Sequence, residues 1–236
     1  MTLHALHDAA TVAGLVGAPR PECDSLALST ENPSEVLFAF VATNPLGPDW
    51  LVDLDLPGTR VACWSGTLDH EGAARGDLFA AHPHNWMQPG PEALNRLLDG
   101  VIPGLERHQR SLCLIPHARH VLNDVQGSIN LIRERSDAPI EVALAPTAML
   151  APSMLGTLED HLTRCFETLA EHAPFLFLHD VTVDPHDDRL LPTTLGRGIL
   201  DRSIMTDMIR RYWPEDRPVV VPAGSLDVQK DWLYGS

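Results

Sequence analysis

The sequence has few aromatic residues and few basic ones. Phenylalanine, tryptophan and tyrosine make up 6% of its 236 residues, whereas all hydrophobic residues together make up 44%. The core must therefore consist mainly of Leu, Val, Ile and Ala. Lysines and arginines number 17 against 32 aspartates and glutamates, which gives a formal net charge of −15. This excess favours solubility and repels phosphate backbones and anionic lipids, so we expect neither a nucleic acid nor a membrane as partner.

The cysteines form no CxxC pair and lie far apart in the chain. Three of the four are inside apolar runs, where a free cysteine behaves as a small hydrophobic residue; the four are Cys23, Cys63, Cys113 and Cys165. We therefore expect buried thiols and neither disulfides nor zinc. The first apolar stretch also lacks a preceding basic region, and no run approaches the ~20 apolar residues of a membrane span. These features predict a cytoplasmic protein without a signal peptide.

Short apolar runs alternate with longer segments of helical period, a pattern typical of βα units around a parallel sheet. Strands are expected at residues 24–29, 60–64, 111–115, 140–144, 175–179 and 219–221, with a weaker candidate at 77–82. The apolar run 36–41 fits either a strand or a buried helix, because periodicity alone does not separate the two. Helices are expected at residues 90–108, 123–135, 157–172 and 202–213.

Seven or eight strands separated by helices predict an α/β protein with a (β/α)8 TIM-barrel fold. The sequence contains no internal repeat, low-complexity segment or linker, so a single domain over residues 1–236 is expected. Little chain follows residue 221, and the barrel is therefore expected to be irregular or to have a stunted last helix.

Four segments of the C-terminal half follow one another in a recognisable order. They are SLCLIPH (111–117), EVALAPTAML (141–150), FLFLHD (175–180) and LPTTLGRGILD (191–201). Each resembles a strand end or loop of the xylose isomerase-like TIM-barrel superfamily, which includes sugar phosphate isomerases, epimerases and endonuclease IV-like enzymes. The resemblance covers about half of the chain, and the segment with Gly-x-Gly is its most specific part.

The resemblance implies a divalent metal held by Glu, Asp and His side chains at the strand ends. At the corresponding positions this sequence has Ile115, Ala145, Ala148, Phe177 and Pro222. None of these side chains offers the oxygen or imidazole ligands that such a cation needs. We therefore expect the metal site of the family to be lost and no cofactor to be bound, unless a metal site of another kind exists.

Polar residues near predicted strand ends remain candidates for a site, since TIM-barrel active sites lie at the carboxyl ends of the strands. The catalytic candidates are His117, His179 and Asp180. Imidazole suits this role because it titrates near neutrality. The candidates for substrate binding are His82, His84, Trp86 and Arg197, of which the tryptophan offers a surface for stacking on a sugar.

Several of these residues also have a plain structural interpretation. His82 and His84 fit an exposed loop, and Asp180 fits a residue that ties down the loop after its strand. Gly196 and Gly198 fit a tight turn, and Asp201 fits the cap of the helix that starts at residue 202.

Three functions remain open. In the first, a metal-free relative binds a small polyol or sugar-like ligand with weak or no catalysis. In the second, an isomerase or epimerase with a site rebuilt from His82, His84, His117 and His179 acts on a sugar or sugar phosphate through an enediol. A histidine is the base, and a cation or Arg197 stabilises the oxyanion. In the third, the barrel is a non-catalytic scaffold or subunit that forms a homodimer or binds a protein partner. The first two predict a concave polar pocket at the C-terminal face, whereas the third predicts a mouth filled by side chains such as Phe177 and Met149.

Overall fold

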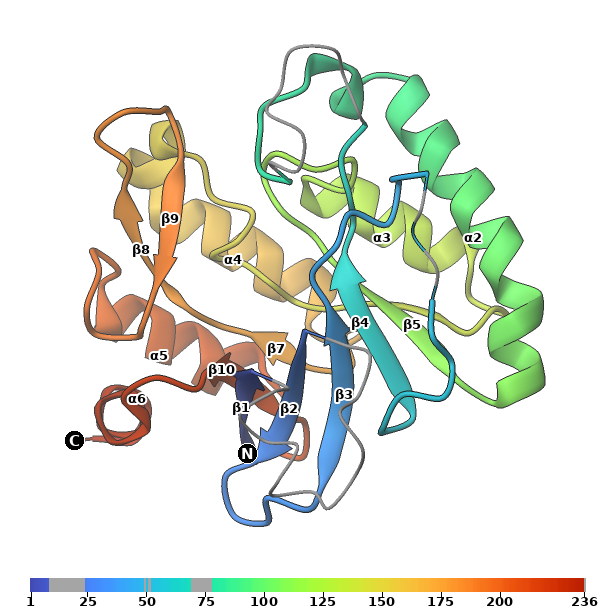
Figure 1. The fold of residues 1–236 in the computed structure, drawn as a ribbon. Helices are drawn as coiled ribbons and strands as arrows, with labels where there is room; N and C mark the ends of the chain where they lie inside the picture. Colours follow the sequence, from blue (N-terminus) through green and yellow to red (C-terminus); the bar gives the residue numbers. More distant parts are fainter. Residues whose placement is uncertain (9–23, 49, 51, 69–77, 236) are drawn as a thin grey trace.

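The computed structural model describes residues 1–8, 24–48, 50, 52–68 and 78–235, which form an eight-stranded sheet flanked by helices (Figure 1). Along the chain its strands are β1 (Leu3–Asp8), β2 (Ser25–Ser29), β3 (Val36–Val41), β4 (Arg60–Trp64), β5 (Ser111–Ile115), β6 (Ile140–Val142), β7 (Leu176–Phe177) and β10 (Val219–Pro222). Their order in the sheet is β6-β5-β4-β3-β2-β1-β10-β7. All neighbours are parallel except β2, which runs antiparallel to both β1 and β3.

The two ends of this sheet meet just beyond β6. Leu144 forms a parallel bridge with Leu176 of β7. The main-chain N–H of Leu144 donates to Phe175 O at 3.1 Å, and that of Phe177 donates to Leu144 O at 2.8 Å. Eight strands therefore form a ring, and the predicted TIM-barrel architecture is confirmed in an irregular form.

The irregularity lies in the first three strands. A parallel neighbour requires a crossover connection, whereas an antiparallel one needs only a short turn. Residues 30–35 supply such a turn between β2 and β3, where Ser29 Oγ accepts the main-chain N–H groups of Glu31 and Asn32. The outer faces of β2 and β3 are covered by chain between β3 and β4, which contributes Leu54 and Leu56.

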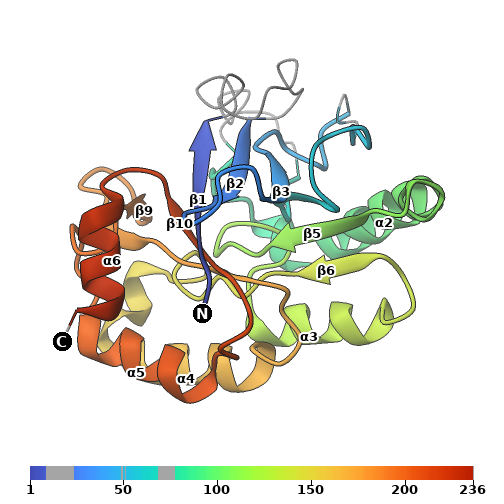
Figure 2. The same cartoon turned by 90° about the horizontal axis from the view of Figure 1, so that it is seen from below.

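Helices pack along the outside of the remaining strands (Figure 2). They are α2 (Pro89–His108), α3 (Val125–Glu134), α4 (Leu158–Leu169), α5 (Arg202–Tyr212) and α6 (Leu226–Tyr234). The first four confirm the predicted helices to within a few residues, and α6 is the short last helix. Leu94, Leu98 and Leu105 lie buried on one side of α2, as its spacing requires. Over the described ranges, no helix has the length and apolar character needed to cross a membrane.

One predicted strand is wrong and one ambiguous run is settled. Val36–Val41 forms β3. Leu78 to His82 form a turn that leads into the 3₁₀ helix η1 (Pro83–Trp86), so the weak strand candidate is absent there, and its first residue lies outside the described residues. Pro83 at the start of η1 and the main-chain bond from Asn85 to His82 O favour the turn over an extended strand.

The barrel interior is filled by apolar side chains. Phe38 and Phe175 stack there with ring centroids 4.6 Å apart. The same interior cluster contains Ile115, Ala145 and Phe177, three of the side chains that replace the metal ligands implied by the resemblance. Phe177 is buried in this cluster, whereas Met149 is buried on the helix side, so only one of the two side chains named for the scaffold hypothesis lies inside the barrel.

The described cysteines are buried free thiols, as expected from the sequence. They are Cys63, Cys113 and Cys165. Burial raises the pKa of Cys63 and of Cys165 to about 12, so neither is a thiolate near neutral pH. Cys23 lies outside the described residues.

Candidate functional site

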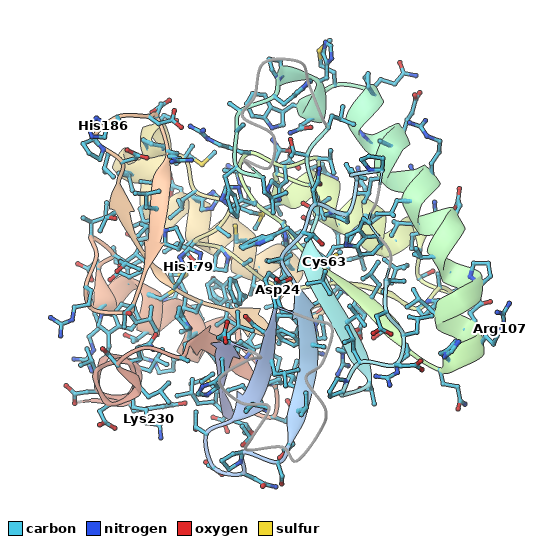
Figure 3. All side chains as sticks on the ribbon, in the orientation of Figure 1. Asp24, Cys63, Arg107, His179, His186 and Lys230 are labelled. Atoms are coloured by element: carbon cyan, nitrogen blue, oxygen red, sulfur yellow. The ribbon has the colours of Figure 1, made fainter. Side chains whose placement is uncertain are left out.

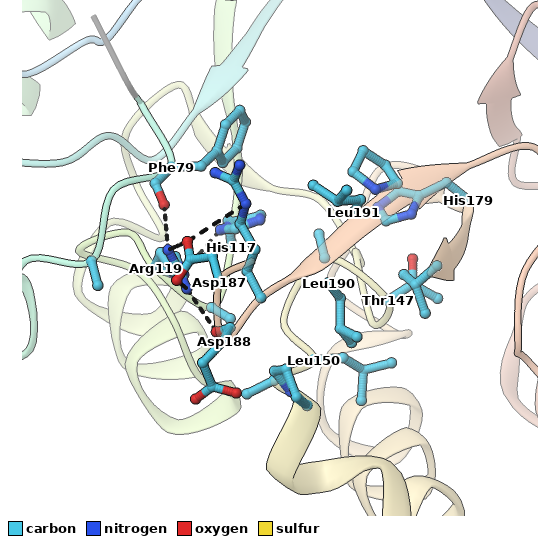
Figure 4. A pocket seen from close by; sticks show the side chains of 18 of the residues that line it. Phe79, His117, Arg119, Thr147, Leu150, His179, Asp187, Asp188, Leu190 and Leu191 are labelled. Atoms are coloured by element: carbon cyan, nitrogen blue, oxygen red, sulfur yellow. Dashed lines mark hydrogen bonds and ion pairs between the residues drawn. The ribbon is translucent and has the colours of Figure 1, made fainter. Parts of the chain in front are cut away.

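A cavity of about 500 Å³ lies at the carboxyl ends of parallel strands of the barrel (Figure 4). Trp64 at the end of β4 and segments that follow β5, β6 and β7 form part of its wall. The rest comes from η1, from the turn before it, and from a two-stranded hairpin, β8 (Asp180–Val183) and β9 (Leu190–Thr193), inserted between β7 and α5. Thirteen of the twenty lining residues are apolar; the other seven are His117, Arg119, Thr147, His179, Asp187, Asp188 and Arg189.

His117 lines the cavity as a neutral hydrogen-bond donor. Its Nδ1 accepts the main-chain N–H of Arg119 at 3.1 Å, so the single proton of the neutral ring is on Nε2. Burial lowers the pKa of His117 to about 2, with smaller contributions from His120, His179 and Arg119. The ring is therefore uncharged at neutral pH and offers Nε2–H.

His179 lines the same cavity in the opposite tautomer. Its Nδ1 lies 2.9 Å from the main-chain oxygen of Asp180. A carbonyl oxygen only accepts, so Nδ1 carries the proton and Nε2 keeps a lone pair. Burial lowers the pKa of His179 as well. The two rings stand on opposite sides of the cavity, with Leu190 between them (Figure 4).

Thr147 lines the wall but does not offer its hydroxyl to the cavity. Its side chain follows β6, and the residue is only 1% exposed. Its Oγ1 is buried and has no hydrogen-bond partner among the residues that the structure describes. A buried hydroxyl without a partner costs free energy in the folded state.

Arg119 ties the hairpin to the opposite wall. Its guanidinium donates to both carboxylate oxygens of Asp187, at 2.7 and 3.0 Å, and to Asp188 O at 2.6 Å. It also donates to Phe79 O, in the turn before η1, at 3.1 Å. The hydrogen bond from Arg119 holds the pKa of Asp187 below its usual value. Arg189 Nε in turn binds Asp184 at 2.8 Å, so both arginines of the cavity are paired with aspartates.

Trp86 is the one candidate for substrate binding that lines the cavity. It is 50% exposed at the end of η1. The buried neighbour Asn85 holds η1 in place, because its side-chain amide donates to Thr67 Oγ1 and Arg119 O at 2.7 and 2.8 Å. The sequence analysis therefore found this surface.

The other three candidates for substrate binding lie outside the cavity wall. His82 is buried, and its Nδ1 accepts the main-chain N–H of His84 at 3.1 Å, which caps η1. His84 is exposed. Arg197 is exposed in the glycine loop. Figure 3 shows His179 inside the fold and His186 at the outer end of the hairpin.

Asp180 also lies outside the wall, although its position near a predicted strand end had suggested a catalytic role. Its buried carboxylate accepts four main-chain N–H groups, from Val181, Gly196, Gly198 and Leu200, at 2.8 to 3.1 Å. Gly198 approaches so closely that a Cβ there would lie 2.3 Å from Asp180 Oδ1. The glycine loop is thus wrapped around this carboxylate.

The sequence analysis missed Thr147, Arg119 and Trp64 as cavity residues. Arg119 stands between two histidines after a correctly predicted strand, which is a usable signal. Thr147 and Trp64 carried none, because a single threonine or tryptophan near a strand end is common. The part of the cavity wall that the β8–β9 hairpin forms could be recognised only from the structure.

A divalent metal does not fit the described residues. Within the ranges that the structure covers, no three His, Cys, Asp or Glu side chains come together as a possible metal site. The positions that the resemblance assigns to ligands hold apolar side chains, and Ile115 and Ala145 are fully buried. Such side chains supply no donor atom.

Comparison with known proteins gives similarity at the level of structure. No family model matches the sequence, and no curated protein matches it. D-psicose 3-epimerase, solved in the presence of D-fructose, aligns with a TM-score of 0.53 at 12% identity, over 97% of this chain and 75% of that one. The probable 3-DHS dehydratase AsbF from Bacillus anthracis, involved in petrobactin synthesis, gives a TM-score of 0.52 at 9% identity, over 85% and 74%.

L-ribulose 3-epimerase aligns with a TM-score of 0.48 at 15% identity, over 74% of this chain and 51% of its own. The chain therefore spans about half the length of that protein. Identities this low concern the fold alone, and the two structures with TM-scores of 0.53 and 0.52 support the irregular TIM-barrel fold described above.

Proposed function

We propose that this protein binds a small, neutral, sugar-like or polyol molecule in the cavity beside its barrel axis, without a divalent metal. The observation that carries the proposal is the pair of uncharged imidazoles with opposite tautomers. His117 offers a donor and His179 an acceptor in one cavity. A hydroxyl group both donates and accepts, so a molecule with several hydroxyls can satisfy both rings.

Size and charge support a neutral ligand. A volume of about 500 Å³ is within the range of roughly 300–1,000 Å³ found for small-molecule pockets. Arg119 already binds both oxygens of Asp187, and Arg189 binds Asp184. A phosphorylated sugar would have to displace these carboxylates. An uncharged ligand needs no such exchange.

The position of the cavity supports the same class of ligand. Barrel enzymes bind their substrates at the carboxyl ends of the strands, where this cavity lies. The solved structure with a TM-score of 0.53 is a D-psicose 3-epimerase, named for a sugar. The absence of donor atoms at Ile115, Ala145 and Phe177 supports binding that does not depend on a metal.

Burial favours binding over catalysis. His179 Nε2 has the lone pair of a general base, and His117 Nε2–H could polarise a carbonyl, so a rebuilt isomerase is the second candidate. Burial lowers the pKa of both rings, however, which makes His179 a weak base. Arg197, expected to stabilise an oxyanion, is exposed outside the cavity wall. Any proton transfer is expected to be slow.

The test is a ligand titration with a chelator present. Neutral pentoses, hexoses and polyols are compared with their phosphates by calorimetry and by thermal shift. We expect a neutral compound to bind and to raise Tm, with no change on adding EDTA, Mn²⁺ or Mg²⁺. His179→Leu should weaken binding about tenfold, whereas the control His84→Leu, at an exposed ring outside the cavity, should not. Tighter binding of phosphates, or binding that EDTA abolishes, would contradict the proposal.

A further inference from the structure

The cavity wall is more apolar than a free sugar requires. We infer that the ligand is an aryl glycoside, a neutral sugar that carries an aromatic substituent; this inference rests on the proposed function. The starting point is the composition of the wall, in which thirteen of twenty residues are apolar.

Polar groups without partners are few in this wall. Those identified among the described residues are Nε2–H of His117, Nε2 of His179 and the carboxylate of Asp188, since Arg119 and Arg189 bind other aspartates. A free sugar has a hydroxyl on nearly every carbon. These few groups bind only some of the hydroxyls of a free sugar and leave the others facing apolar atoms. A buried hydroxyl without a partner weakens binding, so a free sugar fits only part of this cavity.

The remaining space has the character of an aromatic subsite. Leu150, Leu190 and Leu191 line it (Figure 4). Trp86 lines the cavity as well and is 50% exposed, so half of its large aromatic surface is accessible to a ligand. An aromatic ring placed against the indole would bury apolar surface of both.

The two parts of the wall are joined in one cavity. His117 and Trp86 line the same space, so a single molecule can contact both. A sugar linked to an aryl group has polar and apolar parts in this arrangement. The linkage is neutral, consistent with the paired charges at Arg119 and Asp187.

The experiment compares matched glycosides on the whole chain. Dissociation constants are measured by calorimetry for phenyl and methyl glycosides of glucose, galactose, mannose and xylose, and for phenol alone. For the preferred sugar we expect the phenyl glycoside to bind at least about tenfold more tightly than the methyl glycoside. Trp86→Ala should reduce this preference to about twofold or less. The control Met87→Ala, at an exposed neighbour that does not line the cavity, should keep it.

The possible results distinguish failure of the aryl-glycoside inference from failure of the proposed sugar binding. Equal binding of phenyl and methyl glycosides by the wild-type protein overturns the aryl subsite and leaves sugar binding intact. Phenol that binds as tightly as every phenyl glycoside overturns both, because the sugar then contributes nothing. Failure of every glycoside to bind at millimolar concentration also overturns both. The comparison of ligands on the wild-type chain decides the question even if Trp86→Ala fails to fold.

Discussion

Arg119 donates its main-chain N–H to Nδ1 of His117 at 3.1 Å, while its guanidinium holds Asp187 at 2.7 and 3.0 Å. One residue therefore fixes the tautomer of a cavity histidine and also binds the hairpin that closes the cavity. The two roles use different atoms. The main-chain hydrogen bond to His117 does not depend on the Arg119 side chain, so a mutation can remove the contact with the hairpin and leave the tautomer of His117 unchanged.

Replacement of Asp187 by Asn tests the role of the guanidinium. We expect Tm to fall by several degrees, because the largely buried Arg119 loses its counter-charge. Amide hydrogen exchange should accelerate in β8 and β9, and ligand should associate and dissociate faster. The control is Asp207→Asn, which removes exposed ion pairs on α5 and should change neither. Unchanged exchange in the hairpin would show that the ion pair does not hold it.

The buried histidines predict a dependence of stability on pH. The folded-state pKa values of His117 and His120 are about 2 and about 3, lowered mainly by burial, against about 6.5 in an unfolded chain. As pH falls below about 6.5, the unfolded state binds protons that the folded state does not. The free energy of unfolding is therefore expected to decrease as the pH falls from about 6.5 to about 3, by about 1.4 kcal/mol per pH unit for each histidine.

Denaturant unfolding of His120→Gln at pH 7, 6 and 5 measures this effect for one residue. Glutamine keeps a donor for Leu78 O, which His120 Nε2 contacts at 3.0 Å. The slope of unfolding free energy against pH should be smaller than in the wild type by about 1.4 kcal/mol per unit. His84→Gln, at an exposed ring, should leave the slope unchanged. Equal slopes for wild type and His120→Gln would mean that His120 charges in the folded state.

The success of the sequence analysis depended on the strength of the strand signals. β4, β5 and β10 are near-continuous apolar runs, because parallel strands are buried on both faces. His117 and His179 follow strongly predicted strands and do line the cavity. His82 and His84 were proposed because they follow the weak strand candidate; its described residues, 78–82, form a turn, and both histidines lie outside the wall.

Other features depended on tertiary contacts that local patterns do not contain. β1 escaped prediction because its sequence, LHALHD, interleaves two histidines with its apolar residues. The β8–β9 hairpin was not predicted, because both strands are short and β9 contains Pro192. The tautomers of the two cavity histidines are set by main-chain groups of neighbouring residues. Residue identity carries no information about that geometry.

Replacement of Asp180 by Asn should mainly affect stability. The carboxylate accepts four main-chain N–H groups, and an amide would turn its NH₂ toward some of these donors. We expect the free energy of unfolding to fall by about 2–4 kcal/mol. The control Asp201→Asn should change it little, because Asn caps a helix as well as Asp does. A stable Asp180→Asn variant with altered ligand turnover would instead support the catalytic role predicted from the sequence.

Replacement of Thr147 by Val separates a ligand contact from a structural one. Valine has nearly the same shape and removes a buried hydroxyl that has no partner among the described residues. Stability should therefore stay the same or rise slightly, because an unpaired polar group costs free energy in the folded state. Ligand affinity should change less than about twofold, because Oγ1 is buried away from the open cavity. Calorimetry and denaturant unfolding measure the two quantities, and Thr147→Ser, which keeps the hydroxyl, should match the wild type in both. A Thr147→Val variant that keeps its stability but loses affinity would show that the hydroxyl contacts the ligand.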